Sequence, residues 1–450
     1  MLRLSGSGLG SCVICARGVA EGAGSMGKPN SRGVWGALGP GLLFAAAAVG
    51  VSHLVQSTRA GAVYGLGLVV LVLVANAIKY PAFRFGPHYA VATRTSLLEG
   101  YRRQGTWALA LYAVLTVLTM FTVLAAVTIV TAGLAIAVLG IKQSAVVVSA
   151  AIIAVCASLL AVGRYHWLDR ITKVLVAVLT LSTLAATALA LPRVDFSTLA
   201  LFPSGPVDKA TIFFVAALVG WMPSAIDVSV WQSLWTLARS ADSGHAPTLK
   251  ESSTDFHIGY VGTALLALCF VIMGAGAMYG TGQKFPDSAG AFAGQVITLY
   301  ANSLGEASRP IIGTAAFAVM FSTVLTVVDG FPRAIAVLVA RFRGPETASQ
   351  FELDEPAQKR TYWVALIVIC VGALSVIGMM MTSLKTLVDL ATTASFLTGP
   401  VLSVLNHRAV LGPEVPAASR PRPWLVRASL LGIVCQGIFA LYYLGVRYGG

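Results

Sequence analysis

The chain has 450 residues, of which 57% are hydrophobic and 11% are charged, and its mean hydropathy is +0.80. Soluble domains carry about 25% charged residues, so this composition excludes an ordinary soluble protein and predicts an all-α polytopic membrane protein. The net charge of +13 does not indicate a nucleic-acid partner, because Lys and Arg lie in short connections between apolar runs, where they set topology. The predicted partner at this point is the lipid bilayer, and the sequence leaves the oligomeric state open.

Apolar windows of about 20 residues, the length that crosses a bilayer, recur along the chain. They predict eleven transmembrane spans: 37–58, 61–80, 106–137, 145–163, 171–192, 210–238, 256–280, 309–340, 361–381, 384–408 and 424–446. The preceding tail, 1–36, is rich in Gly and Ser near its start and contains Cys12 and Cys15. Their spacing suits a redox or zinc pair, but no second pair accompanies it.

The distribution of basic residues predicts the orientation. Most of the 31 Lys and Arg residues fall in inner segments if the N-terminus is cytoplasmic, and such a bias marks the cytoplasmic side. With an odd number of spans, the C-terminus is then outside. The predicted location is a bacterial-type plasma membrane.

The sixth span contains a predicted break. Pro223 removes a backbone donor in the middle of the apolar run Val215–Trp235, at a cost of roughly 3 kcal/mol in a helix interior. Gly220 and Asp227 flank it. Interrupted helices with polar groups at the break are typical of transporter binding sites, although a merely kinked helix is the alternative.

The first span is interrupted as well, at Gly50-Val-Ser-His53. Two breaks five spans apart are expected of a five-plus-five inverted repeat, in which the broken helices face each other at the midplane. This predicts a first repeat at 37–192, an extracellular loop at 193–209, a second repeat at 210–409, and a loop with an eleventh span at 410–450.

Two segments resemble a known family. Gly39-Pro-Gly41, the break about ten residues later, and Ala60–Gly65 are similar to the first span of NRAMP divalent-metal transporters, and Val219–Ser224 resembles the Ala-x-x-Met-Pro-His signature of their sixth span. The resemblance implies a LeuT-like fold and an ion-coupled secondary transporter rather than an enzyme, with no cofactor beyond a transported metal.

The departures from the family pattern fall at its metal site. Gly50 stands at the family's metal-binding Asp, His53 at its Asn, and Ser224 at the His that is associated with proton handling. Val219 matches the Ala whose carbonyl binds metal, and Met222 keeps its type. The expected substrate-binding residues are therefore Gly50, His53, Val219, Met222 and Ser224.

Several of these residues have more than one interpretation. Met222 is either a soft metal ligand or an apolar residue that fills a gap, and His53 is either a metal or proton site or a satisfied core histidine. Three acidic residues, Asp227, Asp329 and Asp389, are candidates for a coupling-ion or proton pathway. Asp227 could instead pair with Arg59, and Asp329 with Arg333.

Two cargo hypotheses follow. The family resemblance favours divalent metal cations, with possible proton coupling, and Met222 and His53 as candidate metal ligands. The lost acidic ligand favours a small organic solute, such as an amino acid or carboxylate, because half-helix N-termini attract carboxylates. A substrate-free scaffold is a third possibility.

Overall fold

The computed structural model describes residues 39–201, 208–282, 289–306, 309–345, 356–379 and 384–448. Every regular element in these ranges is a helix, as the composition predicts. The Cys12–Cys15 pair and nearly all of the predicted N-terminal tail lie outside the described residues.

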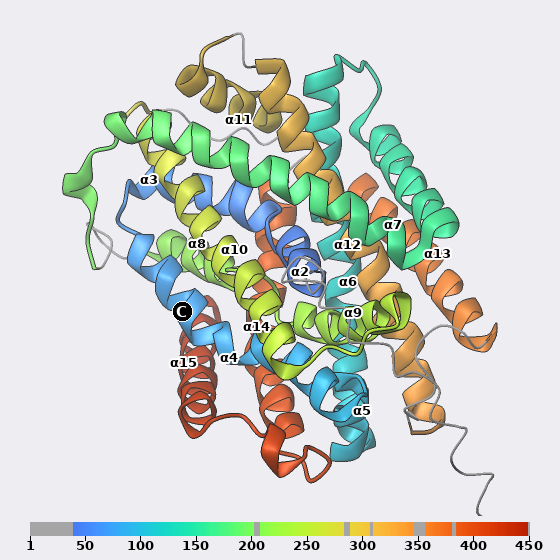
Figure 1. Cartoon of the computed structure of the whole chain (residues 1–450). Helices are drawn as coiled ribbons and strands as arrows, with labels where there is room; N and C mark the ends of the chain where they lie inside the picture. Colours follow the sequence, from blue (N-terminus) through green and yellow to red (C-terminus); the bar gives the residue numbers. More distant parts are fainter. Residues whose placement is uncertain are drawn as a thin grey trace, which may run out of the picture. The chain divides into compact units, whose positions relative to one another are not determined.

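The first half of the chain contains a broken helix and the longest described helix, α7 (Figure 1). The elements are α2 (Pro40–Ala48), the π-helix η1 (Ser52–Ser57), α3 (Thr58–Tyr64), α4 (Val69–Thr93), α5 (Leu97–Gln104), α6 (Thr106–Leu139), α7 (Ala145–Ala190), and two 3₁₀ turns, η2 (Leu191–Arg193) and η3 (Phe196–Thr198). Two candidate spans, Ala145–Val162 and Tyr165–Arg193, together cover nearly all of α7 and η2.

The second half begins with a second broken helix. Its elements are α8 (Lys209–Gly220), α9 (Asp227–Ser243), α10 (Leu249–Met278), α11 (Ala289–Leu304), α12 (Arg309–Arg343), α13 (Pro356–Met379), α14 (Leu384–Val410), η5 (Ala417–Ser419) and α15 (Pro423–Tyr448).

Nine candidate membrane spans lie among the described residues, two of them in the α7 region, and the broken span formed by α2 and η1–α3, bent by 47°, makes ten. The helices α8 and α9 are not counted because they contain only 12 and 17 residues and are separated by the segment 221–226. If the pair is counted as the two halves of one broken span, the total is consistent with the predicted eleven.

The structure differs from several of the predicted boundaries. The first span runs on to Tyr64, and α4 continues to Thr93 through Pro81 and Pro87, because neighbouring groups can satisfy backbone that proline frees inside a helical membrane protein. Two further helices, α5 and α11, occupy segments that were expected to be connections. The first is short and amphipathic, so a search for apolar windows misses it.

Close backbone contacts fix the broken first span against α10. A Cβ at Gly41 would lie 2.0 Å from the Asp255 carbonyl oxygen, and one at Gly61 would lie 2.0 Å from that of Val271. Glycine is required at both positions because the helices touch through their backbones. Asp255 also caps α2, since its carboxylate accepts hydrogen bonds from the N–H groups of Gly39 and Gly41 at 3.0 and 2.7 Å.

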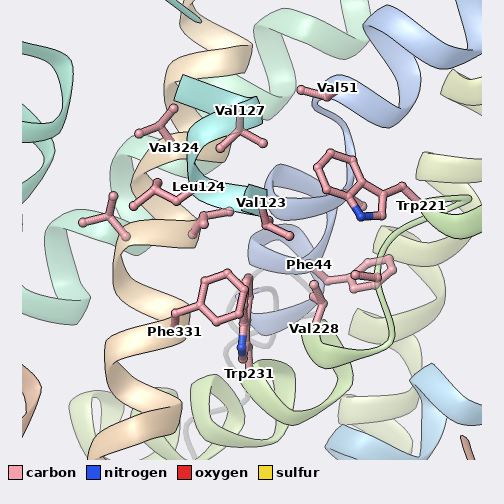
Figure 2. Packing of buried hydrophobic residues seen from close by; sticks show 14 of the residues in the cluster. Phe44, Val51, Val123, Leu124, Val127, Trp221, Val228, Trp231, Val324 and Phe331 are labelled. Atoms are coloured by element: carbon pink, nitrogen blue, oxygen red, sulfur yellow. The ribbon is translucent and has the colours of Figure 1, made fainter. Parts of the chain in front are cut away.

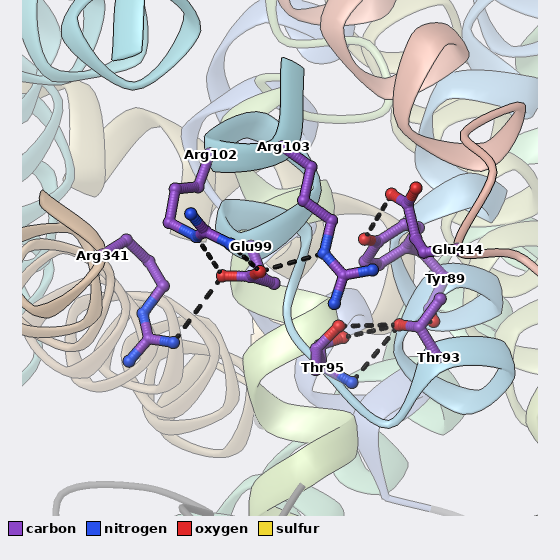
Figure 3. A network of polar contacts seen from close by, with 8 residues as sticks. All are labelled: Tyr89, Thr93, Thr95, Glu99, Arg102, Arg103, Arg341 and Glu414. Carbon is purple, nitrogen blue, oxygen red and sulfur yellow. Dashed lines mark hydrogen bonds and ion pairs between the residues drawn. The ribbon is translucent and has the colours of Figure 1, made fainter. Parts of the chain in front are cut away.

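A polar network holds α5 in place (Figure 3). The buried Glu99 carboxylate accepts hydrogen bonds from Arg102 and Arg103 at 2.8–2.9 Å, and Arg341 of α12 lies 3.7 Å away. The opposing charges make burial of this carboxylate possible. The Tyr89 hydroxyl donates to Glu414 at 2.9 Å, which links α4 to the segment after α14.

Candidate functional site

The break in the sixth span follows from its sequence. The carbonyl of Val219 would accept a hydrogen bond from residue 223 in a continuous helix, but Pro223 has no N–H. The helix α8 therefore ends at Gly220, and α9 begins at Asp227. The peptide bond between Met222 and Pro223 is cis.

The break in the first span lies between Ala48 and Ser52, and Thr323 of α12 occupies it. The Thr323 hydroxyl donates a hydrogen bond to the Ala46 carbonyl at 2.8 Å. A Cβ at Gly50 would lie 2.7 Å from Cγ2 of Thr323. The position that resembles the family's metal-binding Asp therefore has no room for a side chain in this structure.

A small cavity of about 30 Å³ lies between the two breaks. Its walls come from α2, η1, α6, α9, α12 and the segment between α8 and α9, and Figure 2 shows the large side chains around it. The lining residues are Ala47, Ala48, Val51, Ser52, Val123, Val127, Trp221, Ser224, Ala225, Asp227, Val228, Trp231, Thr323, Val327 and Phe331. A space of this size holds a water molecule or a small ion.

Asp227 is the acidic residue in the cavity wall. It lies in the first turn of α9 and is 1% exposed, and neither of its carboxylate oxygens has a hydrogen-bond partner from another described residue. An isolated buried carboxylate is costly unless a cation or a proton neutralises it. The Arg59 pairing considered from the sequence does not occur here, since Arg59 pairs with Asp389.

The other predicted residues at this break face different surroundings. The Val219 carbonyl accepts a hydrogen bond from the Lys79 side chain at 2.6 Å. Met222 is fully buried in an apolar cluster with residues such as Leu218 and Val271, and it does not line the cavity. Ser224 does line the cavity, next to Asp227.

His53 is buried against α10. Its Nε2 lies 3.0 Å from the Thr263 carbonyl oxygen, and its Nδ1 lies 2.7 Å from the Ser52 hydroxyl. The ring also packs edge-on against Phe270. In this conformation the imidazole is directed at neighbouring helices and does not line the cavity.

Asp329 and Asp389 both form ion pairs. Asp329 binds Arg333 through both carboxylate oxygens at 2.8–2.9 Å and accepts hydrogen bonds from Trp235 and Tyr362. Asp389 of α14 pairs with Arg59 of α3 at 2.9 Å. The structure therefore brings Ser224 and Asp227 to the cavity wall and places the other two acidic residues elsewhere.

Two residues at the breaks were not singled out from the sequence. One of them, Lys79, had a visible signal, because a Lys inside an apolar run predicts a functional site. The other, Thr323, had none, because Thr is common in helix contacts within membranes. Among the described residues, no group of three or more His, Cys, Asp or Glu side chains is arranged to hold a metal.

Comparison with known proteins decides the family. Residues 41–442 match the family model described as natural resistance-associated macrophage protein-like, Nramp. The chain belongs to the Nramp family. An uncharacterized protein of Pasteurella multocida, PM0681, is 32% identical over 416 residues, which cover 92% of this chain and 93% of that protein.

Solved structures confirm the LeuT-like fold of this Nramp protein. A mutant of the Eremococcus coleocola manganese transporter matches with a TM-score of 0.66 and 16% identity, over 94% of this chain and 90% of that one. MhsT, solved in complex with L-phenylalanine, matches with a TM-score of 0.61 and 15% identity, over 91% and 98%. The family identifies an integral membrane transporter rather than an enzyme, as the sequence predicts.

Proposed function

We propose that this Nramp protein is a secondary active transporter that moves a divalent metal cation across the membrane by alternating access. The observation that carries the proposal is the unpartnered Asp227 carboxylate, which is buried at the break of the sixth span and faces the small cavity. A cation in this cavity would neutralise the carboxylate, and the resemblance to a manganese transporter supports a metal cargo.

The ligand chemistry is expected to be dominated by oxygen. The cavity offers the Asp227 carboxylate and the hydroxyl of Ser224, and water would complete the coordination shell. Such ligands suit Mg²⁺ and Mn²⁺. Ligation by Met222 or His53, which the sequence suggested, requires these side chains to turn toward the cavity in another state of the transport cycle.

Proton coupling is part of the proposal, and Asp227 supports it. A carboxylate in apolar surroundings is stable when it holds either a cation or a proton, so the two would exchange at this residue. Two ion pairs on opposite sides of the breaks would open in turn: Arg59–Asp389 between α3 and α14, and Arg239–Asp169 between α9 and α7.

The orientation, with the N-terminus cytoplasmic and the C-terminus outside, remains a prediction, as does the bacterial-type plasma membrane.

Uptake by purified protein in liposomes tests the function. Wild-type protein should take up Mn²⁺ or Mg²⁺ saturably and move protons with it. The Asp227→Asn variant should lose at least about 90% of uptake, which corresponds to a free-energy change of about 1.4 kcal/mol or more. The control variant Met222→Leu conserves the size of the side chain and should retain uptake if oxygen ligands dominate. Loss of uptake in this control would instead indicate that Met222 is a metal ligand. Normal metal uptake by Asp227→Asn would refute the proposed site.

One observation favours the alternative, a small organic solute. Aromatic side chains of Trp221, Trp231 and Phe331 wall the cavity (Figure 2), and MhsT binds L-phenylalanine on the same fold. An enlarged outward-open cavity could accept such a solute. Uptake of a labelled amino acid or carboxylate, with no response to Mn²⁺, Cd²⁺ or Mg²⁺, would establish this alternative.

A further inference from the structure

The side-chain amino group of Lys79 lies among three main-chain carbonyls at the break of the sixth span. Its Nζ lies 2.6 Å from the Val219 carbonyl oxygen, 2.8 Å from that of Gly220 and 3.4 Å from that of Ser224. The residue is 2% exposed. A lysine ammonium has three N–H donors, and three main-chain acceptors surround this one.

The break of the helix creates these acceptors. Pro223 cannot donate to the Val219 carbonyl, whose main-chain donors are instead the N–H groups of Trp221 and, at 3.2 Å, Met222. The last carbonyls of a helix also carry the negative end of its dipole. In transporters with broken helices, such carbonyls and helix ends coordinate the coupling cation.

Lys79 has no ion-pair partner among the carboxylates of the described residues. Its charge is therefore compensated by the carbonyls and by the helix end. Because Lys79 belongs to α4 and the carbonyls belong to the end of α8 and the segment that follows it, the contact also ties a continuous span to the broken one.

We propose that Lys79 is a tethered cation that permanently occupies a monovalent-cation site formed by the carbonyls of Val219, Gly220 and Ser224. An ion dissolved in the medium is then not needed at this site, and the Val219 carbonyl is not free to bind cargo. This inference goes beyond the proposed transport function, because it holds whichever solute the Asp227 cavity carries.

Removal of the side chain should expose the site to an external cation. The Lys79→Ala variant would be purified in detergent, and its thermal midpoint would be measured by tryptophan fluorescence. The medium would contain N-methyl-D-glucamine chloride, replaced stepwise at constant ionic strength by the chloride of NH₄⁺, n-butylammonium, Na⁺ or K⁺. The Tm should fall by about 5 °C or more, as expected when hydrogen bonds to a buried charged group are lost. It should then rise saturably with at least one small cation, because a ligand that binds the folded state stabilises it.

Three comparisons isolate the cause. Wild-type protein and Lys142→Ala, which changes an exposed lysine, should show no cation dependence. Lys79→Met keeps the length of the side chain and fills the space without a charge, so it should be destabilised and should not respond to cations. A Lys79→Ala variant whose Tm is insensitive to every cation would overturn the proposal.

Failure of the variant to fold also gives a decisive result. If Lys79→Ala aggregates in N-methyl-D-glucamine chloride, its recovery as a monodisperse peak would be compared across the same salts. Recovery only with a small cation supports the tethered-cation site. Equal aggregation in all salts shows that no external cation can replace the lysine, and the proposal fails.

Discussion

The methyl group of Thr323 lies 2.7 Å from the position that a Cβ would take at Gly50. These two residues come from α12 and from the break in the first span, and the Thr323 hydroxyl also satisfies the Ala46 carbonyl at 2.8 Å. A threonine thus fills the place where the family pattern has a carboxylate. The contact explains why glycine is present at the break.

Gly50→Ala should destabilise the protein by about 1–3 kcal/mol, the usual cost of overpacking, because the stiff β-branched Thr323 cannot easily move away. The free energy of unfolding in mixed micelles would be measured for Gly50→Ala, Thr323→Ala and the double variant. The two substitutions should be non-additive, since Thr323→Ala removes the clash. Strict additivity would show that the two side chains do not meet.

The Arg59–Asp389 pair should contribute to closure of the path between α3 and α14. The Arg59 side chain is 10% exposed and that of Asp389 is 33% exposed, so Asp389→Asn leaves the more buried partner without its counter-charge. This substitution should cost roughly 1–3 kcal/mol, between the values for exposed and buried pairs. Arg59→Gln should cost less, because the remaining carboxylate is better hydrated.

The same two variants can be tested for opening of the path between α3 and α14. Accessibility of a cysteine introduced at Gln56, which also donates to Asp389 at 3.2 Å, would be followed with a polar thiol reagent. The background for this experiment would be a variant without native cysteines. Faster labelling in Asp389→Asn is the expected result, and unchanged labelling would assign the pair a purely structural role.

Asp329 should act mainly in stability. Tyr362→Phe removes one hydroxyl donor at 3.1 Å and should cost about 1 kcal/mol. Asp329→Ala breaks the buried ion pair with Arg333 and should cost about 3–5 kcal/mol. Proton-coupled uptake by Tyr362→Phe should be normal when scaled to the folded fraction, and a changed proton-to-metal ratio would instead support the pathway role predicted from the sequence.

The loop after α7 should show a pH-dependent local stability. Hydrogen bonds from the Ser197 side chain and backbone N–H lower the pKa of the exposed Asp195 carboxyl. A lowered folded-state pKa means that the contribution to stability is present above the unfolded-state pKa and is lost as the pH falls through the folded-state pKa. Hydrogen exchange at the Ser197 amide, corrected for its intrinsic pH dependence, should accelerate at low pH. Asp195→Asn should remove this response, and an unaltered profile in that variant would contradict it.

The sequence by itself determined the class of protein and the positions of both breaks. The excess of apolar residues requires helices in a membrane, because each backbone polar group must be satisfied within the bilayer. Pro223 lacks a backbone N–H donor whatever the tertiary structure, and Gly50 destabilises its helix through its own backbone freedom. These are properties of short segments, so the family and the LeuT-like fold could be inferred from them.

Only the tertiary structure decided which groups meet at the breaks. The contacts of Lys79 with Val219 and of Thr323 with Ala46 join residues 140 and 277 positions apart, and no local pattern specifies them. Met222 keeps the residue type of the family signature, yet its side chain packs in an apolar cluster. Side-chain direction at an irregular backbone depends on the helices packed around it, and for this reason the unpartnered Asp227 emerges as the principal candidate ligand only once the fold is known.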